Sequence, residues 1–138
     1  MGHNSSKEIC GRRMIKSDTE AFMRCNKLGK VDMMLGEPRE SEHWYIEEYQ
    51  MEHTPSRAVF RTSLSPGRIL RGLPDGNVDL VTSDPKNCPR SIWIPWQNSD
   101  DTWSFRNAEG GYLSVQGSNV FCNKAEIGSS EKFTLPTW

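Results

Sequence analysis

The sequence predicts an all-β fold made of three copies of one unit of about 45 residues. Two observations support this prediction. Short segments alternate apolar and polar residues between turn-forming residues, and the same order of segments occurs three times along the 138 residues. No stretch keeps a 3.6-residue apolar period beyond two turns, so α-helices are not expected. The length suits one domain.

Each unit opens with an apolar residue followed by a basic one, and successive pairs are 45 residues apart. These pairs are Ile15-Lys16, Phe60-Arg61 and Phe105-Arg106. A turn, a second apolar pair and a glycine-containing turn follow in every unit, and we expect a positive φ at that glycine. The glycines of this second turn are Gly29, Gly76 and Gly117.

Each unit closes with a longer loop and an aromatic residue, which is Trp44, Trp93 or Phe133. An aliphatic residue follows two positions later in the first and third units, whereas Pro95 stands there in the second. Each unit therefore predicts four short strands. Three units arranged about a pseudo-threefold axis would bury a common apolar face and hide the strand edges. The sequence thus predicts a β-trefoil over residues 11–138, with repeats at about 11–54, 55–99 and 100–138, after a flexible segment at residues 1–10.

Two runs of sequence carry a family resemblance: GGYLSV at 110–115 and EKF at 131–133, with weaker echoes in AFMR at 21–24 and EHW at 42–44. These runs resemble the fascin-like and hisactophilin-like branch of the β-trefoils, over nearly the whole chain. The resemblance implies binding and crosslinking of actin filaments. Hisactophilin-like chains are rich in histidine, whereas three histidines occur here, so a pH-switched charge is not expected. Fascin-like bundlers use several trefoils in tandem, so a lone domain would need a dimer or two binding faces.

Basic residues gather in the first hairpins of the first two units, although the formal net charge is only −1. Residues 55–72 contain four arginines and no acidic residue. We expect such residues to contact an acidic protein surface, that of actin in the first place, and the binding to weaken with salt. The alternative is ordinary solvated hairpins. The predicted contact residues are Lys16, Arg24, Lys27, Lys30, Arg61, Arg68 and Arg71.

The first residues match the N-myristoylation pattern M-G-x-x-x-[ST], with Gly2 as acceptor and Ser6 as the specifying hydroxyl. One acyl chain gives marginal membrane binding, so nearby basic residues would supply the second signal. The alternative is a flexible N-terminus that matches the pattern by chance and is not acylated. The first dozen residues lack the apolar region of a secretory signal, and the four cysteines are irregularly spaced. We therefore expect free thiols and a cytoplasmic protein, peripheral at the inner membrane face if Gly2 is acylated. Two disulfides in a secreted domain are the alternative.

The sequence does not predict an enzyme, a metal site or a cofactor. Its carboxylate pairs, Glu47-Glu48 and Asp100-Asp101, are adjacent residues that would point to opposite faces of a strand. The sequence contains no recognisable motif that combines a catalytic nucleophile with a general base. Protease inhibition by the proline-containing loop at 83–90 is a further hypothesis without a diagnostic motif.

Sugar binding is the main alternative to actin binding, because many β-trefoils are lectins. Ricin-type lectins place Gln-x-Trp where this chain has residues 42–44, 91–93 and 131–133, and none of the three runs contains the glutamine. Trp96 and Trp138 are candidate platforms for stacking a sugar ring. The other interpretation is that both pack against the barrel.

Overall fold

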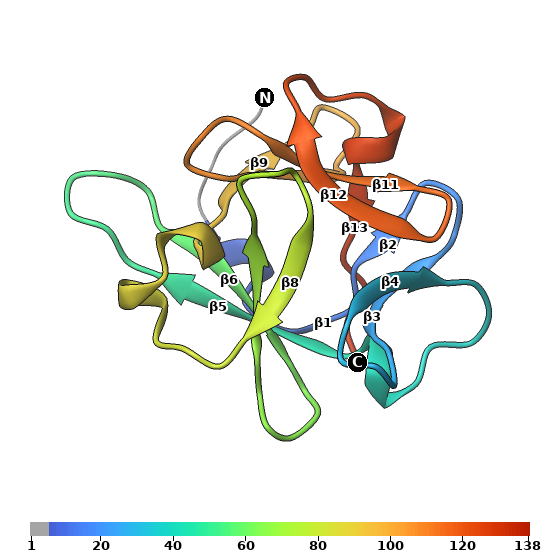
Figure 1. Cartoon of the computed structure of the whole chain (residues 1–138). Helices are drawn as coiled ribbons and strands as arrows, with labels where there is room; N and C mark the ends of the chain where they lie inside the picture. The colour runs from blue at the N-terminus through green and yellow to red at the C-terminus, as the bar shows by residue number, and fades with distance from the viewer. Residues whose placement is uncertain (1–5) are drawn as a thin grey trace.

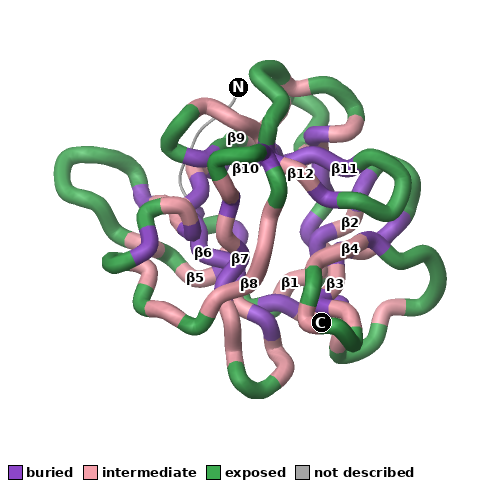
Figure 2. The backbone as a smooth tube through the Cα atoms, in the orientation of Figure 1, coloured by how far each residue is buried: buried purple, intermediate pink, exposed green. Residues whose placement is uncertain are grey.

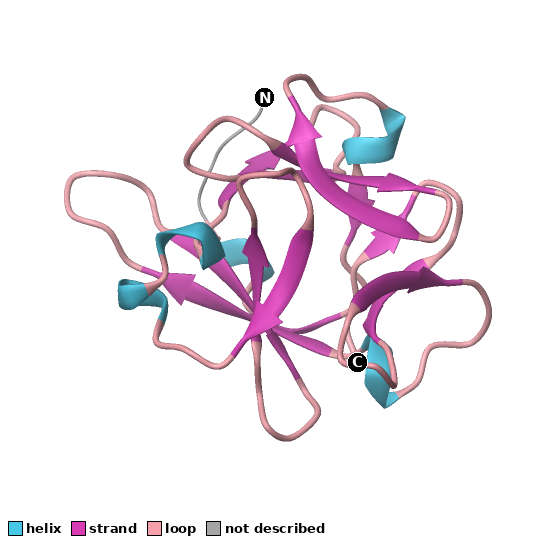
Figure 3. Cartoon of the chain, viewed as in Figure 1, coloured by secondary structure: helices cyan, strands magenta, loops and turns pink. Residues whose placement is uncertain are grey.

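The computed structural model of the chain describes residues 6–138 and has an all-β architecture (Figures 1 and 3). Its strands are β1 (Gly11–Arg13), β2 (Lys16–Ser17), β3 (Phe22–Cys25), β4 (Val31–Met34), β5 (Trp44–Tyr49), β6 (Arg57–Thr62), β7 (Ile69–Gly72), β8 (Val78–Val81), β9 (Ile94–Gln97), β10 (Trp103–Arg106), β11 (Tyr112–Gln116), β12 (Asn119–Lys124) and β13 (Phe133–Thr134). Its short 3-10 helices are η1 (Lys7–Ile9), η2 (Glu40–Glu42), η3 (Pro85–Asn87), η4 (Pro89–Ser91) and η5 (Ser129–Glu131).

The strands pair in a threefold arrangement. Each repeat contributes one two-stranded hairpin, β3–β4, β7–β8 or β11–β12. The closing strand of each repeat pairs with the opening strand of the next, so β5 pairs with β6, β9 with β10 and β13 with β2. The opening strand of the first repeat is interrupted and forms β1 and β2, which gives thirteen strands in the described residues where the repeat predicts twelve. The predicted β-trefoil is confirmed.

The core lies on the pseudo-threefold axis and uses the apolar residues that open and close each repeat. Phe60 and Phe105 are fully buried, and their rings meet edge to face at 4.8 Å between centroids. The Trp44 indole donates a hydrogen bond to the Met23 carbonyl at 3.0 Å. Exposed residues lie mainly in the loops and hairpin turns, away from this core (Figure 2). Burial of these large side chains is the main source of stability.

Two local expectations can be compared with the structure. The second-turn glycines all have positive φ, with values of 75° at Gly29, 89° at Gly76 and 61° at Gly117. Pro95 is buried and lies opposite Phe105 in the pairing of β9 with β10. The proline therefore takes the place of the aliphatic residue in the core, and the second repeat keeps the pattern despite its different sequence.

The Glu-x-aromatic runs that carry the family resemblance have a structural explanation. The Glu131 carboxylate is buried and accepts hydrogen bonds from the Ser114 hydroxyl and, at 2.8 Å, from the Gly128 N–H. Glu42 is equally buried and accepts a hydrogen bond from the Arg39 N–H at 3.3 Å. Both glutamates thus hold the 3-10 turn that precedes a closing strand. Their recurring place in the repeat is thus explained by a structural role.

The chain before β1 packs against the second repeat. Ile9 is 2% exposed and belongs to the core, and the Ser6 hydroxyl is buried and donates to the Arg57 carbonyl at 2.8 Å. Residues 6–10 of the segment predicted to be flexible are therefore in contact with the barrel. Gly2, the predicted acylation site, lies outside the described residues. No helix in residues 6–138 is long and apolar enough to span a membrane.

Candidate binding cleft

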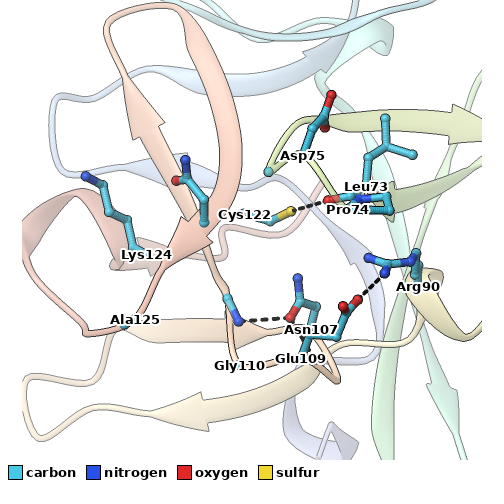
Figure 4. A pocket seen from close by; sticks show the side chains of 13 residues that line it. Leu73, Pro74, Asp75, Arg90, Asn107, Glu109, Gly110, Cys122, Lys124 and Ala125 are labelled. Atoms are coloured by element: carbon cyan, nitrogen blue, oxygen red, sulfur yellow. Dashed lines mark hydrogen bonds and ion pairs between the residues drawn. The ribbon is translucent and has the colours of Figure 1, made fainter.

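A cleft of about 330 Å³ separates the hairpins of the second and third repeats (Figure 4). We call it the interrepeat cleft. The turn between β7 and β8, the turn between β10 and β11, the end of β12 and the helix η4 form its walls. Its polar side chains are those of Asp75, Arg90, Asn107, Glu109, Asn123 and Lys124.

The first wall is the tight turn from Leu73 to Asn77. The Leu73 N–H donates to the Asn77 carbonyl at 2.8 Å, and Gly76 supplies the left-handed residue. The Asp75 carboxylate accepts hydrogen bonds from the backbone and side-chain amides of Asn77, each at 3.0 Å. The backbone hydrogen bond, followed by the side-chain one, lowers the pKa of Asp75 below its usual value. Asp75 is therefore an ionised acceptor held in one orientation at the cleft.

The second wall is the turn from Asn107 to Gly111. The buried Asn107 side chain accepts hydrogen bonds from the N–H groups of Glu109 and Gly111, at 3.0 and 2.9 Å. Gly111 lies so close to β12 that a Cβ atom there would be 2.0 Å from the Cys122 carbonyl oxygen. Only glycine allows this approach of two backbones. The turn is thus fixed against β12, and Glu109 has a defined position at the rim.

An ion pair between Arg90 and Glu109 joins the two repeats across one end of the cleft (Figure 4). The other end is lined by Asn123 and Lys124, whose side chains offer amide and ammonium groups. The cleft therefore presents cationic donors, anionic acceptors and neutral amides, and none of the described residues that line it is aromatic.

The Cys122 thiol is buried beside the cleft and donates to the Asn77 carbonyl at 3.4 Å. All four cysteines are free in the structure. Burial is the main reason why the pKa of Cys122 is raised, so the residue remains a protonated thiol at neutral pH. A protonated thiol is a poor nucleophile. Cys122 is therefore not an activated nucleophile at the cleft.

The basic residues predicted to contact a partner are mostly paired within the chain. Arg24, Arg61 and Arg71 each make two hydrogen bonds to a carboxylate on the neighbouring strand, which is the main reason why the pKa of each arginine is raised. Lys16 forms an ion pair with Glu20. The acidic partners of the three arginines are Asp32, Glu47 and Asp79.

The remaining three predicted contact residues belong to neighbouring turns. Lys27 and Lys30 are exposed on the β3–β4 turn. Arg68 lies against the same turn, with Nη2 at 3.3 Å from the Cys25 sulfur and its guanidinium over Gly29. The structure thus brings Arg68 to the first hairpin, while four of the seven charges are balanced by internal partners. Contact with a filament surface stays a prediction.

The two candidate tryptophans have different environments. The Trp138 indole donates to the carbonyls of Arg13 and Trp44, at 3.2 and 3.0 Å, and stacks on His43 at 4.3 Å between centroids. Packing against the barrel is therefore the correct interpretation for Trp138. Trp96 is 42% exposed on the outer wall and is available as a platform.

Reasoning from the sequence did not identify Asp75, Arg90 or Glu109. These residues lie far apart along the chain and meet only where the second and third repeats pack together. The available signal was the Pro74-Asp75-Gly76 run, which places a carboxylate at the tip of a tight turn.

No protein-family model and no curated protein matches the chain. Solved structures do match. The protein SeviL bound to the asialo-GM1 saccharide has a TM-score of 0.73 at 15% identity, over 93% of this chain and 98% of that one. The BEL β-trefoil in its apo form has a TM-score of 0.75 at 11% identity, over 93% of both chains.

A mosquitocidal holotoxin also matches, with a TM-score of 0.79 at 13% identity. The match covers 94% of this chain but only 17% of the toxin chain. At such identities these likenesses establish the β-trefoil fold alone. They do not confirm the fascin-like and hisactophilin-like branch.

Proposed function

We propose that this chain is a carbohydrate-binding module and that its ligand occupies the interrepeat cleft. The observation that carries the proposal is the polar lining of the cleft, in which the ionised Asp75 carboxylate, held by Asn77, borders a volume of about 330 Å³ together with the Asn123 amide and the Lys124 ammonium. A sugar hydroxyl both donates and accepts hydrogen bonds, so it matches a lining that contains acceptors and donors. The volume is at the lower end of the range for small-molecule sites.

The rigidity of the two turns favours this function. Asp75 is held by Asn77 and Glu109 is held by Arg90 before any ligand arrives. Groups that are already ordered lose little conformational entropy on binding. The fold likeness to SeviL, which was solved with a saccharide, agrees with the proposal.

Binding is proposed rather than catalysis. Glu109 is engaged by Arg90, and Cys122 remains a thiol. Actin binding gains no support from the internally paired arginines or from the structural neighbours. Acylation of Gly2, with the membrane association that it would bring, stays a separate prediction.

The test is titration of the chain with a panel of neutral oligosaccharides that includes the asialo-GM1 saccharide, monitored by calorimetry or amide NMR shifts. Asp75→Asn keeps a turn-forming residue but removes the charge. It is expected to weaken binding about tenfold, because a hydrogen bond to a charged group contributes about 1.5–3 kcal/mol.

The matched control is Asp101→Asn, which removes an exposed carboxylate outside the cleft at a positive φ of 67° that asparagine tolerates. It is expected to leave the affinity unchanged. Absence of binding to every neutral sugar, or equal affinities for wild type and Asp75→Asn, would reject the cleft as the site.

A further inference from the structure

A basic residue occupies the same position on the outer wall of the barrel in all three repeats. Lys16, Arg61 and Arg106 each lie between one residue of the preceding closing strand and one residue of the following hairpin. The flanking residues are Thr134 and Phe22 in the first repeat, Tyr45 and Ile69 in the second, and Ile94 and Tyr112 in the third. The strand register therefore makes the three sites directly comparable.

In two of the sites the positive charge has an acidic partner. Arg61 makes two hydrogen bonds to Glu47, at 2.8 and 3.1 Å, and Glu47 stands two residues after the flanking Tyr45. Lys16 pairs with Glu20 on its own turn. Both cations are thus neutralised locally.

The third site lacks such a partner. Trp96 stands two residues after Ile94, where the second repeat has Glu47. The Arg106 side chain is exposed, and its guanidinium has no hydrogen bond or ion pair within residues 6–138. Ile94, Trp96, Arg106 and Tyr112 line an open surface pocket of about 270 Å³. We call it the aromatic–arginine pocket.

We propose that the aromatic–arginine pocket binds a sugar residue that carries a negative group, with the sugar ring against Trp96 and Tyr112 and the anion on Arg106. Aromatic faces offer a large rigid apolar surface for the C–H face of a ring. A free guanidinium recognises a carboxylate or a sulfate through parallel hydrogen bonds. The inference rests on the proposed carbohydrate function, and it adds a second site and a charge class of ligand.

The pocket and the interrepeat cleft share one structural element. Arg106 directly precedes Asn107, and Tyr112 directly follows Gly111, so the β10–β11 hairpin contributes to both. The described lining of the interrepeat cleft has several polar side chains and no aromatic one. The aromatic–arginine pocket has the aromatic side chains of Trp96 and Tyr112 and the single charge of Arg106. The two sites are therefore expected to prefer different residues of a glycan.

The test uses three probes: a disaccharide that contains a uronic acid, the same disaccharide with its carboxylate reduced to an alcohol, and a sulfated disaccharide. Calorimetry with the whole chain is expected to show binding of one or both anionic probes, and at least about tenfold weaker binding of the reduced probe. The affinity for the anionic probes is expected to fall as salt is added. The two anionic probes separate carboxylate from sulfate as the preferred group.

The decisive variant is Trp96→Glu, which rebuilds at Arg106 the pair that Glu47 makes with Arg61. It is expected to lower the affinity for the anionic probe at least about tenfold, because it removes the platform and neutralises the guanidinium. Arg106→Gln is expected to have a similar effect and decides the question if Trp96→Glu unfolds at a lower temperature. The matched control, Arg61→Gln with Glu47→Gln, removes the equivalent pair of the second repeat and is expected to leave binding unchanged.

The outcomes separate this inference from the proposed function. Absence of binding to both anionic probes, equal affinity for the reduced probe, or wild-type affinity in both Trp96→Glu and Arg106→Gln would each overturn the aromatic–arginine pocket. Asp75→Asn is expected to weaken the neutral sugars while changing the anionic affinity by less than about twofold. Anionic binding that depends on Trp96, without any neutral binding, would reject the cleft and keep the pocket.

Discussion

The hairpins of the first two repeats and the hairpin of the third are stabilised by different interactions. β3–β4 and β7–β8 each carry an arginine opposite an aspartate, Arg24 with Asp32 and Arg71 with Asp79. In β11–β12 the same place is taken by Ser114 opposite Phe121. Ser114 is buried under Glu131, whereas the arginines and aspartates remain partly exposed. The third repeat thus replaces a surface ion pair by a buried hydrogen bond.

The repeats also differ in which of their basic side chains a ligand could contact. The paired arginines of the first and second repeats already have carboxylate partners, so a ligand would have to compete with them. In the third repeat Arg106 has no such partner among residues 6–138, and the cleft beside it is fixed by Gly111 and Asn107. The departure from the threefold pattern at Arg106 therefore supports the proposed aromatic–arginine pocket, which the number of basic residues alone does not indicate.

The largest effect is expected from the buried carboxylate of the third repeat. Glu131→Ala leaves the Ser114 hydroxyl and the Gly128 N–H without their acceptor, so the free energy of unfolding is expected to fall by about 3 kcal/mol. Urea unfolding followed by tryptophan fluorescence measures the change. Glu42→Ala, which removes one 3.3 Å hydrogen bond in the first repeat, is expected to cost about half as much. Equal losses would show that the two repeats use their glutamates alike.

The fold was predictable because its signal repeats. Ile15, Phe60 and Phe105 recur at 45-residue intervals and are fully buried, Phe60 and Phe105 within opening strands and Ile15 directly before β2. The interrepeat cleft was not predictable from local sequence. Asp75 and Glu109 come from different repeats, and Arg90 lies in the short helix η4, which packs against β7. Only the closure of the three repeats brings them together.

The paired state of the arginines could have been predicted from the hairpin register. Arg24 and Asp32 are eight residues apart around Gly29, and Arg71 and Asp79 are eight residues apart around Gly76. A hairpin centred on such a glycine places the two residues opposite each other. An arginine paired with an aspartate adds little positive potential to the surface. Counting basic residues without their partners therefore favoured an acidic binding partner.

A smaller effect is expected from the surface pair of the second repeat. In a double-mutant cycle of Arg71→Met and Asp79→Ala, the coupling energy is expected to be about 0.5–1 kcal/mol, because both side chains are about a third exposed. The coupling should fall as salt is added. The matched cycle at Ser114 and Phe121 in the third repeat is expected to show no dependence on salt. A salt-dependent coupling there would contradict the distinction between the hairpins.

The smallest effect concerns Asp100, whose exposed carboxylate connects the turn before β10 to the closing segment of the third repeat. Hydrogen bonds from the Thr102 hydroxyl and from Lys132 lower the pKa of Asp100 to about 2. An unfolded aspartate has a pKa of about 3.9. The charged form is thus favoured in the folded state, and its stabilising contribution is present above about pH 4 and is lost as the pH falls toward 2.

Asp100→Asn is therefore expected to flatten slightly the dependence of stability on pH between about 4 and 2, and urea midpoints measured across this range would show it. Asp101→Asn removes the neighbouring carboxylate but keeps both of these hydrogen bonds, and it is expected to retain the wild-type slope. Identical slopes for Asp100→Asn and wild type would mean that the contacts of Asp100 with Thr102 and Lys132 do not persist in solution. The third repeat would then rely on its buried core and the Glu131 cap without help from this surface carboxylate, which would sharpen its difference from the other two repeats.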